Sequence, residues 1–196
     1  MTTTTLKPTV RGVGINDVRG STGTPYYQVW NDMLHRCYSA ARHVINPTYI
    51  DCTVDPRWHH LSDFKQWYEQ QGDLTGKQLD KDIISPGNKV YGPDTCFFVS
   101  RQLNSFFLKR QNDRGKYPIG VRIHLEQKRK KPFMSQVHDG SKQKYIGYYH
   151  TPEEAYQAFI QAKKEILLEK FILPETDQQL KQALYNVYNN MEEYFK

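Results

Sequence analysis

Three short stretches of alternating apolar and polar residues, followed by one helical stretch, lie between residues 120 and 166. The alternation in GVRIH (120–124), FMSQVH (133–138) and KYIGYY (144–149) predicts three β-strands. An Asp-Gly pair between the second and third stretches is typical of a hairpin turn. Thr-Pro-Glu-Glu at 151–154 then predicts a helix start, because it combines a capping box with proline in the first turn. The pattern predicts a small antiparallel sheet with one helix packed on it.

The helix predicted after residue 151 carries small and apolar residues at helical spacing. We expect this stripe to be buried: Ala155, Ala158, Phe159, Ala162 and Ile166. The whole pattern resembles the AP2 DNA-binding domain over residues 117–167. The likeness is carried by YPIGVRI at 117–123, KYIGYY at 144–149 and TPEEAYQAFIQAKKEI at 151–166. The resemblance implies a three-stranded antiparallel sheet, packed on a helix, that binds double-stranded DNA.

One face of the predicted sheet is expected to contact DNA, because alternate residues of a strand share a side. The residues that match the DNA face of AP2 domains are Arg122, His124, Gln136, His138, Gln143 and Tyr145. Plant members use several arginines and tryptophans there, so we expect a different sequence preference. In the major groove Arg reads guanine and Gln reads adenine. The residues expected to turn towards the helix are Val121, Ile123, Val137 and Ile146.

The net charge of +6 is concentrated in one part of the chain. Residues 101–145 hold twelve Lys or Arg and three acids, whereas from residue 146 onward acids outnumber bases eight to five. Such a block is typical of phosphate binding; the alternatives are a merely solvated face or a protein-binding or structural sheet. We expect phosphate contacts from Arg101, Lys109, Arg110, Lys128, Arg129, Lys130, Lys131 and Lys144.

A second informative stretch is LDKDIISPGNKVYGPDTCFFVSRQLN, residues 79–104. Two turn-forming triplets, Pro-Gly-Asn and Gly-Pro-Asp, separate its apolar segments. Ser100 is a suitable cap for a helix that carries Asn104. The layout predicts strand, loop, strand and helix. It brings Asp80 and Asn104, two hard oxygen ligands, towards each other, as a Mg²⁺ site requires.

This stretch resembles the HNH, or ββα-metal, nuclease motif of phage homing endonucleases. The resemblance implies a catalytic site of Asp80, Lys81 and Asn104, in which Asp80 and Asn104 hold Mg²⁺ or Mn²⁺ on the scissile phosphate. Two positions depart from the family pattern. Lys81 stands where a water-activating His is expected, and Thr95 stands where an Asn orients that His. Metal binding therefore survives the comparison better than general-base catalysis does.

The complete prediction is an α+β protein of two units. A degenerate HNH-like module with supporting helices spans 25–112, and an AP2-like module spans 117–172, with a linker near 111–116. A Thr- and Gly-rich flexible arm at 1–24 precedes them. The periodicity at 175–196 predicts a last helix, which either packs back on the body or pairs with a second copy as a homodimer. The sequence leaves both open.

Helices are predicted in the first module at Pro25 to Tyr38 and from Ser62 to about Gln71, with a short strand at 49–54 between them. Cys37, Cys52 and Cys96 are odd in number and far apart, without a CxxC pair. They predict core residues rather than a zinc site or disulfides.

No run of the sequence has the length of a membrane span, and no signal peptide is visible. We expect a cytoplasmic protein without membrane contact, in the host cell if the chain is phage-encoded. Three functions fit these observations. One is a site-specific homing-type endonuclease that nicks or cuts DNA. Another is a DNA-binding regulator built from a dead nuclease, and the third is a phage factor that acts on a host complex.

Overall fold

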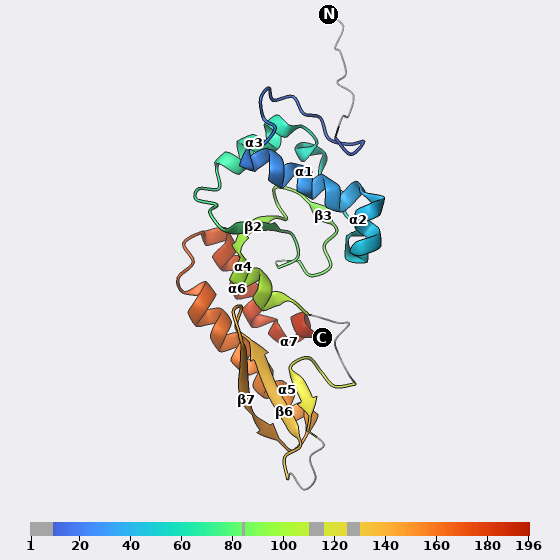
Figure 1. Cartoon of the computed structure of the whole chain (residues 1–196). Coiled ribbons are helices and arrows are strands. Elements are labelled where there is room, and N and C mark those ends of the chain that lie inside the picture. Colours follow the sequence, from blue (N-terminus) through green and yellow to red (C-terminus); the bar gives the residue numbers. More distant parts are fainter. Residues whose placement is uncertain (1–9, 84, 110–115, 125–129) are drawn as a thin grey trace, which may run out of the picture. The chain divides into compact units, whose positions relative to one another are not determined.

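A computed structural model describes residues 10–83, 85–109, 116–124 and 130–196 of the chain. Its contacts divide the chain into two compact units, Met1–Phe98 and Val99–Lys196. Helices combine with small sheets in the structure, so the expected α+β class is confirmed (Figure 1). Within the described ranges, no helix is both long and apolar enough to cross a membrane. The linker expected near 111–116 lies outside the described residues except for its last one.

Helix α1 (Pro25–Tyr38) lies at the centre of the first unit's core, with the bounds that the sequence predicted. Thr24 caps it, because its hydroxyl accepts a hydrogen bond from the backbone N–H of Tyr27. The indole N–H of Trp30 donates to the carbonyl of Trp58 at 2.7 Å. Helix α3 (Leu61–Glu69) packs beside α1, and both bury apolar side chains: Trp30, Met33, Leu34, Cys37, Leu61 and Phe64.

Short elements complete the first unit. They are α2 (Ala40–Ile45), the 3₁₀ turns η1 (Pro47–Tyr49) and η2 (Pro56–Trp58), and strands β1 (Thr53–Val54), β2 (Lys77–Asp80) and β3 (Val90–Tyr91). Strand β1 pairs in parallel with β3, and β2 pairs with β4 (Phe97–Ser100), the strand in which the first unit ends. The strand expected at 49–54 is restricted to its last two residues, because η1 occupies its start.

Residues 10–24, expected to belong to a flexible arm, contact the core of the first unit. The N–H of Ile15 donates to the carbonyl of His59, and the N–H of Leu61 donates to the carbonyl of Ile15. Gly14 lies so close to the core that a Cβ atom there would come within 2.5 Å of the Leu34 side chain. This segment is therefore held by the core from residue 10 onward, while residues 1–9 lie outside the described part of the chain.

The second unit contains the predicted three-stranded antiparallel sheet. Its strands lie in the order β5 (Val121–Ile123), β6 (Phe133–His138) and β7 (Gln143–Tyr149). Helix α5 (Pro152–Ile166) lies along one face of this sheet (Figure 1). The predicted cap is present: the hydroxyl of Thr151 accepts from the N–H of Glu154 at 3.1 Å, and the Glu154 carboxylate accepts from the N–H of His150.

The buried stripe of α5 differs from the predicted one. Ala155 and Phe159 are buried as expected, but the stripe continues through Ile160 and Lys163, while Ala158, Ala162 and Ile166 are only partly buried. The stripe follows a spacing of four residues from Ala155, and this spacing includes a lysine. Lys163 is 3% exposed, and its ammonium lies 3.6 Å from the centre of the Phe106 ring.

The remaining helices of the second unit form an aromatic core around α5. They are α4 (Arg101–Phe107), the π-helical continuation of α5 named η4 (Leu167–Ile172), α6 (Gln178–Asn189) and α7 (Met191–Phe195). Ser100 caps α4 as predicted. The ring of Phe195 contacts Phe159 of α5 with centroids 5.7 Å apart. The C-terminal segment therefore packs back on its own unit, and it consists of two helices rather than one.

Candidate functional site

The pairing register of the second unit's sheet places the predicted DNA-facing residues on one side. Gln136 pairs with Tyr145, and His138 pairs with Gln143, while the buried Val137 lies between them and turns the other way. Arg122 pairs with Met134, which is two residues from Gln136 and therefore shares its side. We call the side opposite α5 the outer face. Its residues are Arg122, His124, Met134, Gln136, His138, Gln143, Tyr145 and Tyr148.

Sequence reasoning missed Tyr148 and Met134 on the outer face. The register between β6 and β7 shifts at one point, because Ser135 pairs with Gly147 while Gln136 pairs with Tyr145. Ile146 is the extra residue of this β-bulge, so it has no opposite partner and Tyr148 turns to the outer face. The ring of Tyr148 lies 5.5 Å from that of Tyr145 and 5.6 Å from that of His124. A lone glycine inside a strand pattern was the signal for this bulge.

The outer face carries cationic, amide and aromatic side chains, and none of the residues assigned to it above is acidic. The nearby carboxylate of Asp139 accepts hydrogen bonds from the N–H groups of Lys142 and Ser141, which hold its pKa well below the usual range. Lys144 lies 3.1 Å from that carboxylate and pairs across the sheet with Val137. Lys144 therefore lies on the side of β7 opposite to the outer face, away from the other predicted DNA contacts of the sheet.

The predicted phosphate contacts have varied surroundings. Arg101, Lys130 and Lys131 are exposed, while the partly buried Lys109 lies 4.7 Å from the ring centre of Tyr194. The remaining three predicted contacts lie outside the described residues: Arg110, Lys128 and Arg129. Tyr145 is the most exposed aromatic side chain of the outer face, at 60%. The exposed members of the set are therefore accessible from solvent.

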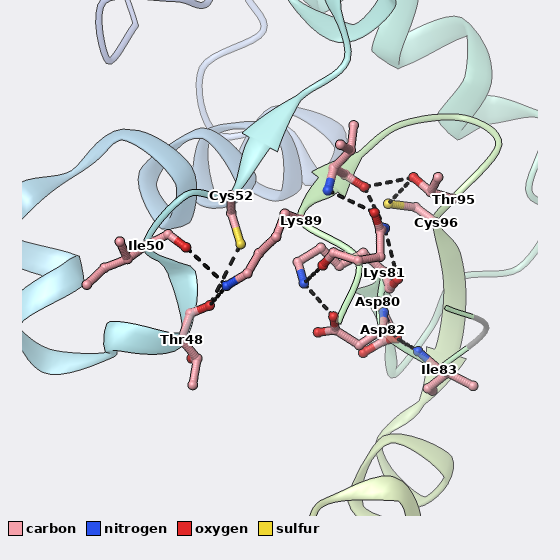
Figure 2. A network of polar contacts seen from close by, with 12 residues as sticks. Thr48, Ile50, Cys52, Asp80, Lys81, Asp82, Ile83, Lys89, Thr95 and Cys96 are labelled. Carbon is pink, nitrogen blue, oxygen red and sulfur yellow. Dashed lines mark hydrogen bonds and ion pairs between the residues drawn. The ribbon is translucent and has the colours of Figure 1, made fainter. Parts of the chain in front are cut away.

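Lys81, predicted to be catalytic, is buried in the loop between β2 and β3 (Figure 2). Its ammonium lies 2.5 Å from the Asp82 carboxylate and donates to the carbonyl of Asn88 at 2.6 Å. The side-chain amide of Asn88 donates back to the carbonyl of Lys81. Lys81 therefore closes this loop through an ion pair with Asp82 and a hydrogen bond to the carbonyl of Asn88. This arrangement favours a structural role for Lys81 over the general-base role at the matching position of the nuclease motif.

Asp80 lies at the end of β2 and is partly buried. Its Oδ1 atom accepts hydrogen bonds from the N–H groups of Asp82 at 2.9 Å and Ile83 at 2.8 Å (Figure 2). Burial raises the pKa of Asp80, although these two hydrogen bonds act in the opposite direction. The second predicted ligand, Asn104, lies on α4 in the second unit. The two predicted metal ligands, Asp80 and Asn104, therefore belong to different units.

The donor set at Asp80 is small for a metal site. Among the residues that the structure describes, no three His, Cys, Asp or Glu side chains gather where they could hold a metal ion. Mg²⁺ is often bound through one or two carboxylates, with water and substrate phosphate completing its shell. Asp80 is one carboxylate of that kind, in the first unit. The hydroxyl of Thr95, at the position of the orienting Asn, instead donates to the carbonyl of Val90 at 2.8 Å.

The three cysteines are buried and free, as predicted. Burial raises the pKa of Cys37 and of Cys96 to about 12, so both remain neutral thiols in the core.

Comparison of the chain with protein-family models, with curated proteins and with solved structures found no match.

Proposed function

We propose that this protein binds double-stranded DNA through the outer face of its three-stranded sheet. The observation that carries the proposal is the register, which aligns Arg122, Gln136 and Tyr145 on one solvent-facing side. A narrow antiparallel sheet fits the major groove, where a guanidinium and a side-chain amide each match one purine edge. Tyr145 and Tyr148 add flat surfaces for contact with bases or sugars. We propose that the outer face recognises a particular DNA sequence.

Affinity is proposed to come from the basic residues around the sheet. Residues 101–145 carry four times as many bases as acids, twelve against three. Lys130 and Lys131 are exposed just before β6 begins, at the edge of the outer face. Such contacts neutralise phosphates and release counterions, so they hold the protein on DNA without reading its sequence.

Replacing Lys128, Arg129, Lys130 and Lys131 together by alanine is expected to weaken the salt dependence of binding. Each side chain that contacts a phosphate should contribute about 0.9 to the slope of log K against log salt. Fluorescence anisotropy of the full chain with labelled duplex DNA, at several salt concentrations, measures this slope. Lys164→Ala, which removes a cation on α5 beside Tyr188, is the control and should leave the slope unchanged. An unchanged slope in the fourfold variant would contradict the electrostatic part of the proposal.

A second candidate function is metal-dependent cleavage of the bound DNA, as in phage homing-type HNH endonucleases. The specific observation in its favour is Asp80, a partly buried carboxylate at the end of β2 whose Oδ1 is held by two backbone N–H groups. With Lys81 engaged by Asp82 and Asn88, the chain offers no general base at the matching position. A bound metal ion would then supply the activated water. Any cleavage is therefore expected to be slow nicking.

Asp80→Ala is expected to abolish Mg²⁺- or Mn²⁺-dependent nicking while leaving DNA binding intact, because binding is assigned to the second unit. Supercoiled DNA is incubated with each protein in the presence of metal or of EDTA. Asp63→Ala, which removes an exposed carboxylate of α3, is the matched control and should nick like wild type. Equal nicking by wild type and Asp80→Ala would reveal a contaminant and remove the enzymatic candidate. Binding without any nicking would favour the regulator built from a dead nuclease.

A further inference from the structure

A partly enclosed pocket of about 200 Å³ lies within the second unit, beside the outer face. Its walls come from the end of α4, the segment 117–120, all three strands and α5. The segment 117–120 can lie against α5 only because residue 120 is glycine. Gly120 has a φ of +79°, and a Cβ atom there would lie 2.2 Å from the Phe159 ring. The wall is thus built by close backbone packing, and its volume has room for several water molecules.

The charge of the pocket wall has one sign. Three basic side chains line it: Lys109, which follows α4, Arg122 in β5 and Lys163 in α5. His138 of β6 and the amides of Gln136 and Gln143 add further polar groups. None of the described residues that line the pocket is an aspartate or a glutamate. The nearest acid in sequence, Asp139, is already engaged by backbone N–H groups and by Lys144.

Lys163 makes this pocket different from a patch of surface cations. The side chain is buried, and its ammonium donates to the carbonyl of Phe106 and lies 3.5 Å from the carbonyl of His138. The rings of Phe106 and Phe195 lie 3.6 Å and 4.9 Å from it. These contacts hold the amine in one place at the floor of the pocket. An amine that is already held in one place loses less conformational freedom on binding an anion than a mobile surface lysine does.

We propose that this pocket binds a phosphate group. Lys109 at the wall and the buried amine of Lys163 would donate hydrogen bonds to the phosphate oxygens, and Arg122 would add positive charge beside them. A phosphate of bound DNA and the phosphate of a free small molecule offer the same chemistry. The first source rests on the proposed function, because the pocket adjoins the outer face, whereas the second source does not.

The test is a titration of the full chain with inorganic phosphate, monitored by ¹H–¹⁵N NMR. Chloride keeps the ionic strength constant. Ser105 and Gly120 line the pocket, so the NMR signals of their backbone amides report on binding there. Saturable shifts at millimolar phosphate are expected. Lys109→Gln should weaken the apparent affinity roughly tenfold, the effect of losing one charge-assisted hydrogen bond. The control Lys164→Gln should not change it. Shifts that never saturate, or equal weakening by the control, would overturn the proposal.

Repeating the titration with saturating duplex DNA identifies the source of the phosphate. Loss of the phosphate-dependent shifts in the complex assigns the pocket to the DNA backbone, while unchanged affinity assigns it to a free phosphate compound. Saturable phosphate binding by a chain that ignores DNA would support the pocket and contradict the proposed function. DNA binding without saturable phosphate binding would overturn the pocket and leave DNA recognition standing.

Discussion

Lys163→Ala is expected to destabilise the second unit by about 3–5 kcal/mol, the largest loss predicted for a single substitution in this protein. Truncation leaves a cavity between the rings of Phe106, Phe159 and Phe195. It also removes the donor to the carbonyl of Phe106, which is buried among the same residues. Hydrogen exchange followed by mass spectrometry, read on peptides from 152–166, measures the loss directly in α5.

Tryptophan fluorescence is an internal control for this experiment, because it reports on the first unit. All three tryptophans belong to that unit: Trp30, Trp58 and Trp67. Lys163→Met keeps most of the side-chain volume and is expected to lose less stability than Lys163→Ala. Exchange in α5 that stays at the wild-type rate in Lys163→Ala would contradict the structural role of this lysine.

The same lysine predicts a dependence of stability on pH. Burial lowers the pKa of Lys163 from 10.5 to about 7 in the folded protein. Between these values the unfolded chain holds a proton that the folded chain has released, so the free energy of unfolding rises with pH from about 7 to about 10. Lys163→Met removes the titrating group and should flatten this rise. Urea unfolding of both proteins at several pH values measures it, and an identical rise in the variant would assign it to other groups.

Arg122→Ala is expected to reduce discrimination between DNA sites by about 1–3 kcal/mol, the contribution of a bidentate contact to a base. Lys109→Ala removes a cation from the pocket wall and should weaken all sites about equally. Binding to a panel of duplexes that differ by single base pairs separates the two effects. If Arg122→Ala lowered every affinity by the same factor, Arg122 would be a phosphate contact.

The predictions from sequence were most accurate where caps and periodicity agreed. Helix α1 has the predicted bounds because Pro25 and the Thr24 cap mark its start and an apolar stripe marks its length. Helix α5 likewise begins at the predicted capping box, and β6 has the predicted ends. These signals are local, so they can be recognised without knowledge of the neighbouring elements.

The structure differs from the predictions where contacts between distant parts of the chain determine the conformation or the burial of a residue. The bulge at Ile146 depends on how β7 pairs with β6, and it moves Tyr148 to the outer face. Lys163 follows the apolar spacing of α5, but burial of a lysine depends on the carbonyl of Phe106, which comes from another helix. The position of Lys81 in the motif predicted a catalytic role. In the structure its contacts with Asp82 and Asn88 hold its own loop together. Sequence position alone cannot supply such partners.

Selection from a random library of duplex DNA tests recognition by the outer face most directly. Wild type is compared with a triple variant in which Arg122, Gln136 and Tyr145, all on the outer face, are alanine. The wild-type protein is expected to enrich one sequence, while the triple variant should retain salt-dependent binding and enrich none. Enrichment of the same sequence by both proteins, or of no sequence by wild type, would contradict recognition of DNA through this face.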